Sequence, residues 1–236
     1  MKQLMRRHMS ARLESRANLD PEDADLAAIA RFVPEGFPAP TRDDVYVASA
    51  LVCNNLVDHY STQFTENALR QIVELLPGTN LMTNHDEHSG RALPVGRAYA
   101  AELVDGADGK YVRARFYWER GTEDGDTMAK KISLGIWREV SLSWWMASFT
   151  NSIDGAPMDE SPYYAGQKLP DGQTVVGIMD EVVEVNEFSL VPRGGQKNTS
   201  IGPARSGEVV SIEGVLQAAR ARAERREGLG RYFPAK

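Results

Sequence analysis

Two apolar runs that flank a short glycine-rich loop constrain the fold of this chain most strongly. The runs cover residues 95–104 and 111–118, and Asp105-Gly106-Ala107-Asp108-Gly109 lies between them. A glycine-containing loop of this kind is typical of the connection between two antiparallel strands. The sequence therefore predicts a β-hairpin and, with it, an antiparallel sheet.

Three other segments are expected to add strands. Residues 45–52 form a short apolar run rich in Val and Ala, which favours a buried strand, although periodicity alone does not separate it from a helix. Residues 140–146 carry apolar side chains at every second position, which places Ser141 and Ser143 together on the opposite face of a strand. Residues 175–191 predict one or two further strands.

Helices are expected before, between and after these strands. Apolar residues at helical spacing, ended by Pro77-Gly78, predict a helix around residues 69–76, and residues 126–134 predict a shorter one. Residues 26–30 suggest a helical segment in a loosely attached N-terminal arm. Residues 209–226 predict a C-terminal helix.

The chain is long enough for one folded domain with two arms. It has 236 residues, of which 42% are apolar, and this is sufficient for a single core. Segments rich in strands with few helices indicate an α+β fold. We expect an N-terminal arm and linker over residues 1–40, the domain over residues 41–200 and a helical tail over residues 201–236.

Charge and composition argue against several classes of function. The formal charge of −6 disfavours nucleic acid as the main partner, because phosphate binding needs clustered Lys and Arg. The arginines of the tail alternate with Glu224 and Glu227, which indicates a solvated helix face. Neither a membrane-spanning segment nor a secretory signal is expected. Cys53, the single cysteine, is expected to be a small buried residue in a strand.

Ser141, His85 and Glu187 are the candidate catalytic residues. A serine hydroxyl is a poor nucleophile until an imidazole takes its proton and an acid fixes the imidazole tautomer. Spacing alone proves nothing, because such sets share geometry rather than sequence order. The alternatives are that His85 is a loop histidine without a function, that Ser141 is a solvent-facing strand residue, and that Glu187 is an exposed carboxylate or a partner in an ordinary ion pair.

A metal site is a competing interpretation of the segment around His85. Asn84-His85-Asp86-Glu87-His88 contains two imidazoles and two carboxylates, which are ligand types that zinc accepts. The spacing does not match the helical His-Glu-x-x-His pattern, and no third cluster of ligands stands out. We therefore expect neither a metal nor a cofactor.

Three blocks of the sequence resemble motifs of the prohead (capsid maturation) serine proteases of tailed bacteriophages, which are distantly related to the herpesvirus assemblins. Asn84-His85, followed by Pro94-Val95-Gly96, resembles the histidine block of that family. Val140-Ser141-Leu142-Ser143-Trp144 is similar to its hydrophobic-Ser-hydrophobic-Gly-aromatic strand. Glu187-Phe188-Ser189-Leu190-Val191-Pro192 is similar to its third block, an acidic residue followed by hydrophobic-Ser-Leu-Val.

The resemblance implies a fold and a role for each residue. The fold would be α+β, with a mostly antiparallel, partly closed β-sheet or barrel surrounded by helices. Ser141 would be the nucleophile, His85 the general base and Glu187 the acid that orients His85. Ser143 stands where the family usually has glycine, at a place where that glycine lets backbone N–H groups approach the oxyanion. Ser143 is also the alternative nucleophile, although the motif alignment favours Ser141.

The function implied is that of a prohead maturation serine endopeptidase. Its substrates would be the scaffold protein, the N-terminal extension of the major capsid protein and the protease itself, with partial removal of both arms. A homodimer or larger homo-oligomer inside the procapsid, in the host cytoplasm, would be expected. The alternative is a non-catalytic scaffold or capsid-associated protein that retains the protease fold while Ser143 spoils the oxyanion hole.

Overall fold

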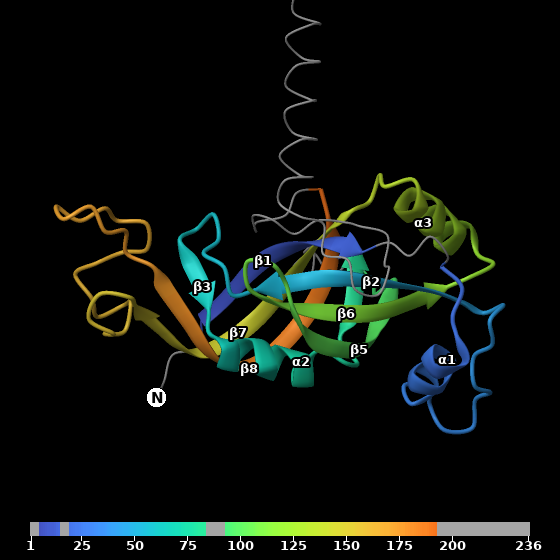
Figure 1. The fold of residues 1–236 in the computed structure, drawn as a ribbon. Helices are drawn as coiled ribbons and strands as arrows, with labels where there is room; N and C mark the ends of the chain where they lie inside the picture. The colour runs from blue at the N-terminus through green and yellow to red at the C-terminus, as the bar shows by residue number, and fades with distance from the viewer. Residues whose placement is uncertain (1–4, 15–18, 84–92, 193–236) are drawn as a thin grey trace, which may run out of the picture. The chain divides into compact units, whose positions relative to one another are not determined.

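The structure, a computed structural model, describes residues 5–14 (backbone only), 19–83 and 93–192. These residues belong to one unit of the chain, Met1–Ala204. They form an α+β fold in which a mixed, mostly antiparallel sheet curls into a half-barrel and three helices pack around it (Figure 1). The fold class expected from the sequence is confirmed.

The described part of the chain contains eight strands and three helices. The strands are β1 (Met5–Glu14), β2 (Val45–Asn54), β3 (Thr62–Phe64), β4 (Asn80–Thr83), β5 (Gly96–Asp105), β6 (Lys110–Glu119), β7 (Glu139–Asn151) and β8 (Gly177–Val191). The helices are α1 (Asp23–Ala30), α2 (Glu66–Leu75) and α3 (Glu123–Ser133).

Strand pairing connects these strands into one curled sheet. Their order is β3-β8-β4-β5-β6-β2-β1-β7, and β7 also pairs with β8. Two of the described strand pairs, β3–β8 and β4–β8, are parallel. Every other described pair is antiparallel. The strands β2 to β8 form the half-barrel, and β1 pairs with β2 over residues 12–14 and with β7 over residues 5–12.

Most of the elements expected from the sequence are present. The hairpin is formed by β5 and β6, and the runs at 45–52 and 140–146 lie in β2 and β7. The helices at 69–76 and 126–134 correspond to α2 and α3. The strands β1, β3 and β4 were not predicted, so the N-terminal arm contains a strand as well as a helix. The C-terminal helix falls outside the described residues.

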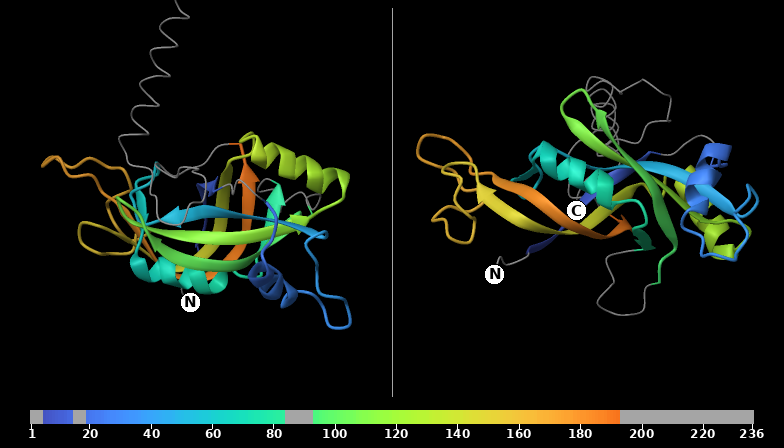
Figure 2. Two further views of the ribbon diagram at one scale, coloured as in Figure 1. Left: turned by 45° about the vertical axis from the view of Figure 1, so that its right-hand side comes forward. Right: turned by 90° about the horizontal axis from the view of Figure 1, so that it is seen from below.

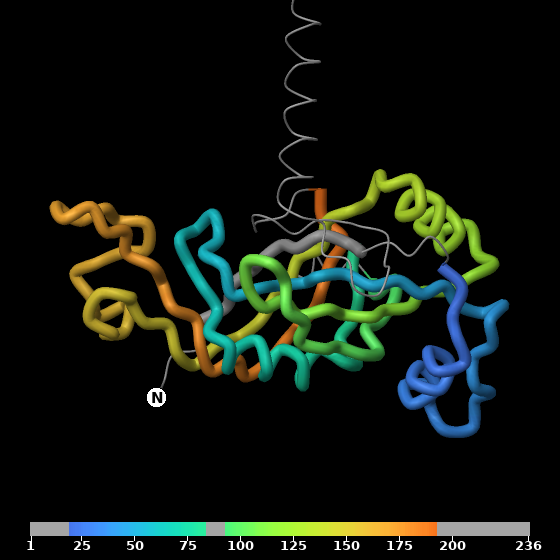
Figure 3. Tube along the Cα trace, in the orientation of Figure 1, coloured from blue at the N-terminus to red at the C-terminus, as the bar shows by residue number. Residues whose placement is uncertain are grey.

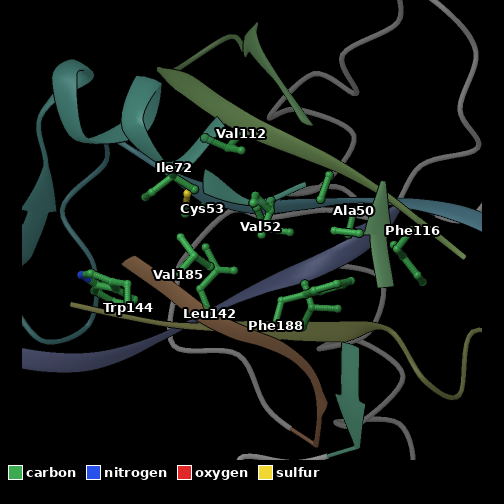
Figure 4. Close-up of a cluster of buried hydrophobic side chains, with 14 of the residues drawn as sticks. Ala50, Val52, Cys53, Ile72, Val112, Phe116, Leu142, Trp144, Val185 and Phe188 are labelled. Atoms are coloured by element: carbon green, nitrogen blue, oxygen red, sulfur yellow. The ribbon is translucent and has the colours of Figure 1, made fainter. Parts of the chain in front are cut away.

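One large hydrophobic core fills the inside of the curled sheet. Figure 4 shows Leu142, Trp144 and Phe188, from β7 and β8, on the opposite side of this core from Val52 and Cys53 of β2. All five are at most 1% exposed. Cys53 is buried in a strand, as expected, and its burial raises the pKa of the thiol.

Helix α2 covers this core. Its first turn is capped by Thr65, whose side-chain oxygen accepts a hydrogen bond from the backbone N–H of Ala68 at 3.0 Å. Ala68, Leu69 and Ile72 are completely buried because they share one face of the helix. Since α2 joins β3 to β4 and both strands pair with β8, it fixes where β4 runs along β8.

Helix α1 packs on the other side of the sheet through a small second cluster of apolar residues that includes Ile29 and Tyr99. A buried carboxylate reinforces this contact. Asp25 accepts a hydrogen bond from the Tyr99 hydroxyl at 2.8 Å and forms an ion pair with Arg115 at 2.5 Å. The arm is therefore attached to the sheet between residues 23 and 30.

The polar segment between β7 and β8 lies at the end of the β7–β8 ribbon away from Ser141. It covers residues 152–176, and Figure 3 traces it in yellow and orange. Asn151 pairs with Gly177 and Ser141 pairs with Ser189, so ten residues of β7 separate the segment's end of the ribbon from Ser141. Figure 2 shows α1 and α3 toward the opposite end of the sheet from this segment. None of the described helices is both long and apolar enough to cross a membrane.

Candidate active site

Four polar residues form a buried polar face on β7 and β8. In the antiparallel register, Ser141 lies opposite Ser189 and Ser143 lies opposite Glu187. Directly opposed residues share one face of a sheet, with Cα atoms about 4.5–5.5 Å apart. The intervening Leu142 faces the core, so this polar face is turned away from the core.

Burial of this face corrects two interpretations that the sequence left open. Ser141 is 1% exposed and Glu187 is 4% exposed, so neither is a solvent-facing strand residue. Ser143 and Ser189 are completely buried. A buried carboxylate requires polar or charged neighbours, and the hydroxyl of Ser143 comes from the position directly opposite.

A β-bulge in β8 gives Glu187 this orientation. Ser143 pairs with Glu187, whereas the next residue, Trp144, pairs with Val185, so Asn186 is the extra residue. In a regular strand Val185 and Glu187 would share a face. Here Val185 belongs to the core cluster and Glu187 to the polar face. Bulges are frequent beside active sites, where they redirect a side chain.

The segment that contains His85 follows β4 directly, although His85 and His88 lie outside the described residues. Thr83, the last residue of β4, is next to Leu190 of β8. On the other side of β8, Leu190 pairs with Val140. Strand β8 therefore lies between the end of β4 and the start of β7, and two strands on either side of a third are about 9–10 Å apart. The chain leaves the described region near Ser141, two residues before His85.

Strand β1 brings a second histidine into register with this face, which the sequence did not suggest. Along the edge of β7, His8 occupies the position opposite Ser143, and Ser10 occupies the position opposite Ser141. The pairing connects residues that are far apart in the sequence. No local pattern around His8 predicts it.

Two further polar residues extend the row on the far side of β8. Asn80 of β4 is paired with Glu187, and Arg97 of β5 is paired with Asn80. The Arg97 guanidinium donates a hydrogen bond from Nη2 to Oδ1 of Asn80 at 3.4 Å. Arg97 also lies opposite Tyr117, where burial raises the pKa of the phenol and the positive charge of Arg97 partly offsets this effect.

The metal interpretation gains no ligands from the described part of the chain. Among those residues no three His, Cys, Asp or Glu side chains gather closely enough to hold a metal ion. The cluster from Asn84 to His88 lies outside them.

The chemistry available on the polar face is that of hydroxyl and carboxylate groups in a water-poor setting. Each serine can donate one proton and accept hydrogen bonds, while an ionised Glu187 can only accept them. An imidazole brought to this face could take a proton from a hydroxyl and be oriented by the carboxylate. The expected set of Ser141 and Glu187 thus shares a face, and the expected His85 follows the neighbouring strand.

Comparisons of the chain with protein-family models, with curated proteins and with solved structures found no match. Family membership therefore remains a prediction from the three sequence blocks.

Proposed function

We propose that this chain is a serine endopeptidase of the prohead maturation type, with Ser141 as the nucleophile, His85 as the general base and Glu187 as the acid that orients His85. The observation that carries the proposal is the register of β7 and β8. It brings Ser141 and Glu187, which come from separate sequence blocks, to the same buried face.

The position of β4 supports the same proposal. This strand ends at Thr83, beside Leu190 of β8, and Leu190 pairs with Val140 next to Ser141. The histidine block of the sequence begins at that point, with Asn84-His85. Nothing in the local sequence of β4 requires this neighbourhood; it follows from the parallel pairing of β4 with β8.

The mechanism is hydrolysis of a peptide bond in two steps. The Ser141 hydroxyl attacks the carbonyl carbon while His85 takes its proton, and the resulting imidazolium gives this proton to the leaving amine. A water molecule then attacks the acyl-enzyme, His85 takes its proton, and the Ser141 hydroxyl is restored as the acid product leaves. Backbone N–H groups stabilise the oxyanion in both steps.

The substrates under this proposal are the scaffold protein, the N-terminal extension of the major capsid protein and the arms of the protease itself. The enzyme would work as a homodimer or larger homo-oligomer inside the procapsid in the host cytoplasm. An extended segment of each substrate would present its scissile bond to Ser141 by pairing with an edge of the sheet.

A fluorophosphonate reagent tests the proposal, because it reacts with an activated serine and not with an ordinary one. We expect one label per chain, located on Ser141 by peptide mass mapping. Ser141→Ala should abolish the label, and His85→Ala should slow it about a hundredfold or more. Ser148→Ala, on the same strand but paired with Asp180 near the other end of β8, is the matched control and should label normally.

A non-catalytic structural role is the second candidate, and the burial of Ser141 favours it. A nucleophile that is 1% exposed must become accessible before a substrate can reach it. If the folded wild-type chain takes up no label, both alone and during procapsid assembly, the protease proposal is rejected and the structural role is preferred. A metal hydrolase would instead be inhibited by chelators and unaffected by Ser141→Ala.

A further inference from the structure

The polar row does not end at Glu187 but crosses two more strands. Asn80 is the β4 residue in register with Glu187, and Arg97 is the β5 residue in register with Asn80. Their chain neighbours Leu81 and Ala98 are completely buried in the core. Because side chains alternate along a strand, Asn80 and Arg97 lie on the same face as Glu187.

The hydrogen bond between these two residues gives the Asn80 amide a direction. Its oxygen accepts from Arg97, on the β5 side. An asparagine amide has one carbonyl oxygen and one NH2 group, so the NH2 group is left for the side of β8. That group is a donor, and Glu187, in the adjacent position of β8, carries an acceptor.

Charge balance points in the same direction. Glu187 is 4% exposed, and a carboxylate that deeply buried is costly unless donors or a positive charge lie nearby. Arg97 supplies a guanidinium two strands away, with the Asn80 amide between them. The sequence of groups is therefore cation, amide and carboxylate.

We propose that Asn80 and Arg97 are positioning residues for Glu187: Arg97 fixes the Asn80 amide, and the amide holds the Glu187 carboxylate in one orientation. The catalytic consequence rests on the proposed function, since Glu187 must itself orient His85. The physical coupling between Asn80 and Glu187 does not rest on it.

Two experiments on the full-length chain test the proposal separately. The first is a double-mutant cycle in urea with Asn80→Ala, Glu187→Gln and the double variant. Coupled residues should show a non-additive change of about fivefold in the unfolding equilibrium constant. Additive effects would overturn the proposal even if the wild-type chain is labelled by a fluorophosphonate.

The second experiment measures the rate of fluorophosphonate labelling. Arg97→Ala and Asn80→Ala should each lower the rate about tenfold, and Arg97→Lys should retain most of it. Guanidinium chloride at a non-denaturing concentration should restore Arg97→Ala but not Asn80→Ala, which a general loss of stability would not produce. Arg113→Ala is the control, since Arg113 pairs with exposed Glu102.

The outcomes of the two experiments are distinguishable. An unlabelled wild-type chain with a coupled cycle rejects the protease proposal and leaves the Asn80–Glu187 coupling supported. A labelled wild-type chain whose rate is unchanged by Arg97→Ala and Asn80→Ala overturns the positioning role and leaves the protease proposal intact.

Discussion

Val185 and Glu187 are two residues apart on β8, yet they face opposite sides of the sheet. Val185 packs in the core, and Glu187 lies opposite Ser143 on the polar face. The bulge at Asn186 causes this change of side. If Asn186 were paired in a regular strand, Glu187 would instead share the core face with Val185.

Deletion of Asn186 should remove the bulge and restore regular alternation. Val185 and Glu187 would then be consecutive residues, so Val185 stays opposite Trp144 on the core side and Glu187 stays opposite Ser143 on the polar face. Because no side chain changes face, we expect the free energy of unfolding to change by no more than about 1 kcal/mol. Urea denaturation measures it.

Asn186→Ala is the matched control, because it keeps the number of residues and hence the bulge. The side chain of Asn186 donates one exposed hydrogen bond to Glu184, so its loss should cost no more than about 1 kcal/mol. A much larger loss of stability in the deletion variant than in Asn186→Ala would contradict the register in which Asn186 is the extra residue between the pairs Trp144–Val185 and Ser143–Glu187.

Asp25 should contribute far more to stability than its neighbour Asp23. Asp25 is 1% exposed and contacts both Arg115 and Tyr99, and removal of its carboxylate leaves a largely buried guanidinium without its counter-charge. Because the Arg115 side chain is 28% exposed, we discount the cost of a fully buried pair and expect about 2–3 kcal/mol for Asp25→Ala.

Asp23→Ala is the control for that variant. Asp23 forms an ion pair with Arg42, but both side chains are exposed, so no measurable change in the urea midpoint is expected. If Asp25→Ala also left the urea midpoint unchanged, α1 would not be anchored to the sheet through Arg115.

Cysteine substitutions test the register of β1 on β7. Opposed residues of an antiparallel pair have Cα separations compatible with a disulfide, so His8→Cys combined with Ser143→Cys should form an intramolecular bridge under mild oxidation. Arg7→Cys with Ser143→Cys should not, because adjacent residues of a strand face opposite sides. Mass measurement of the intact chain detects the bridge, and bridging by both pairs alike would refute the register.

The parts of the fold that local chemistry determines could be predicted from the sequence. The β5–β6 hairpin follows from its glycine-rich loop, and α2 follows from its apolar spacing and its Pro77-Gly78 stop. The strand β1 was not predicted, because its apolar alternation is short: Met9, Ala11 and Leu13 alternate with polar residues, but Arg7 interrupts the pattern toward Met5. Its place depends on pairing with β7.

The candidate site was predictable only in part, for a similar reason. The alternation along β7 placed Ser141 and Ser143 on one face without any structural information. The pairing of Ser143 with Glu187 depends on the bulge at Asn186. A bulge depends on the partner strand as well as on the sequence of the bulged strand. Asn80 and Arg97 gave no signal because their neighbourhood arises from the pairing of three strands.

The role of Ser143 can be decided by comparing three variants in the fluorophosphonate assay. Ser143 lies directly opposite Glu187, so we expect its hydroxyl to help orient the carboxylate. Ser143→Ala and Ser143→Gly should then both lower the labelling rate, by about tenfold. Faster labelling of Ser143→Gly would instead mean that the serine obstructs the oxyanion hole. Loss of all labelling in Ser143→Ala, with labelling retained in Ser141→Ala, would make Ser143 the nucleophile and overturn the assignment to Ser141.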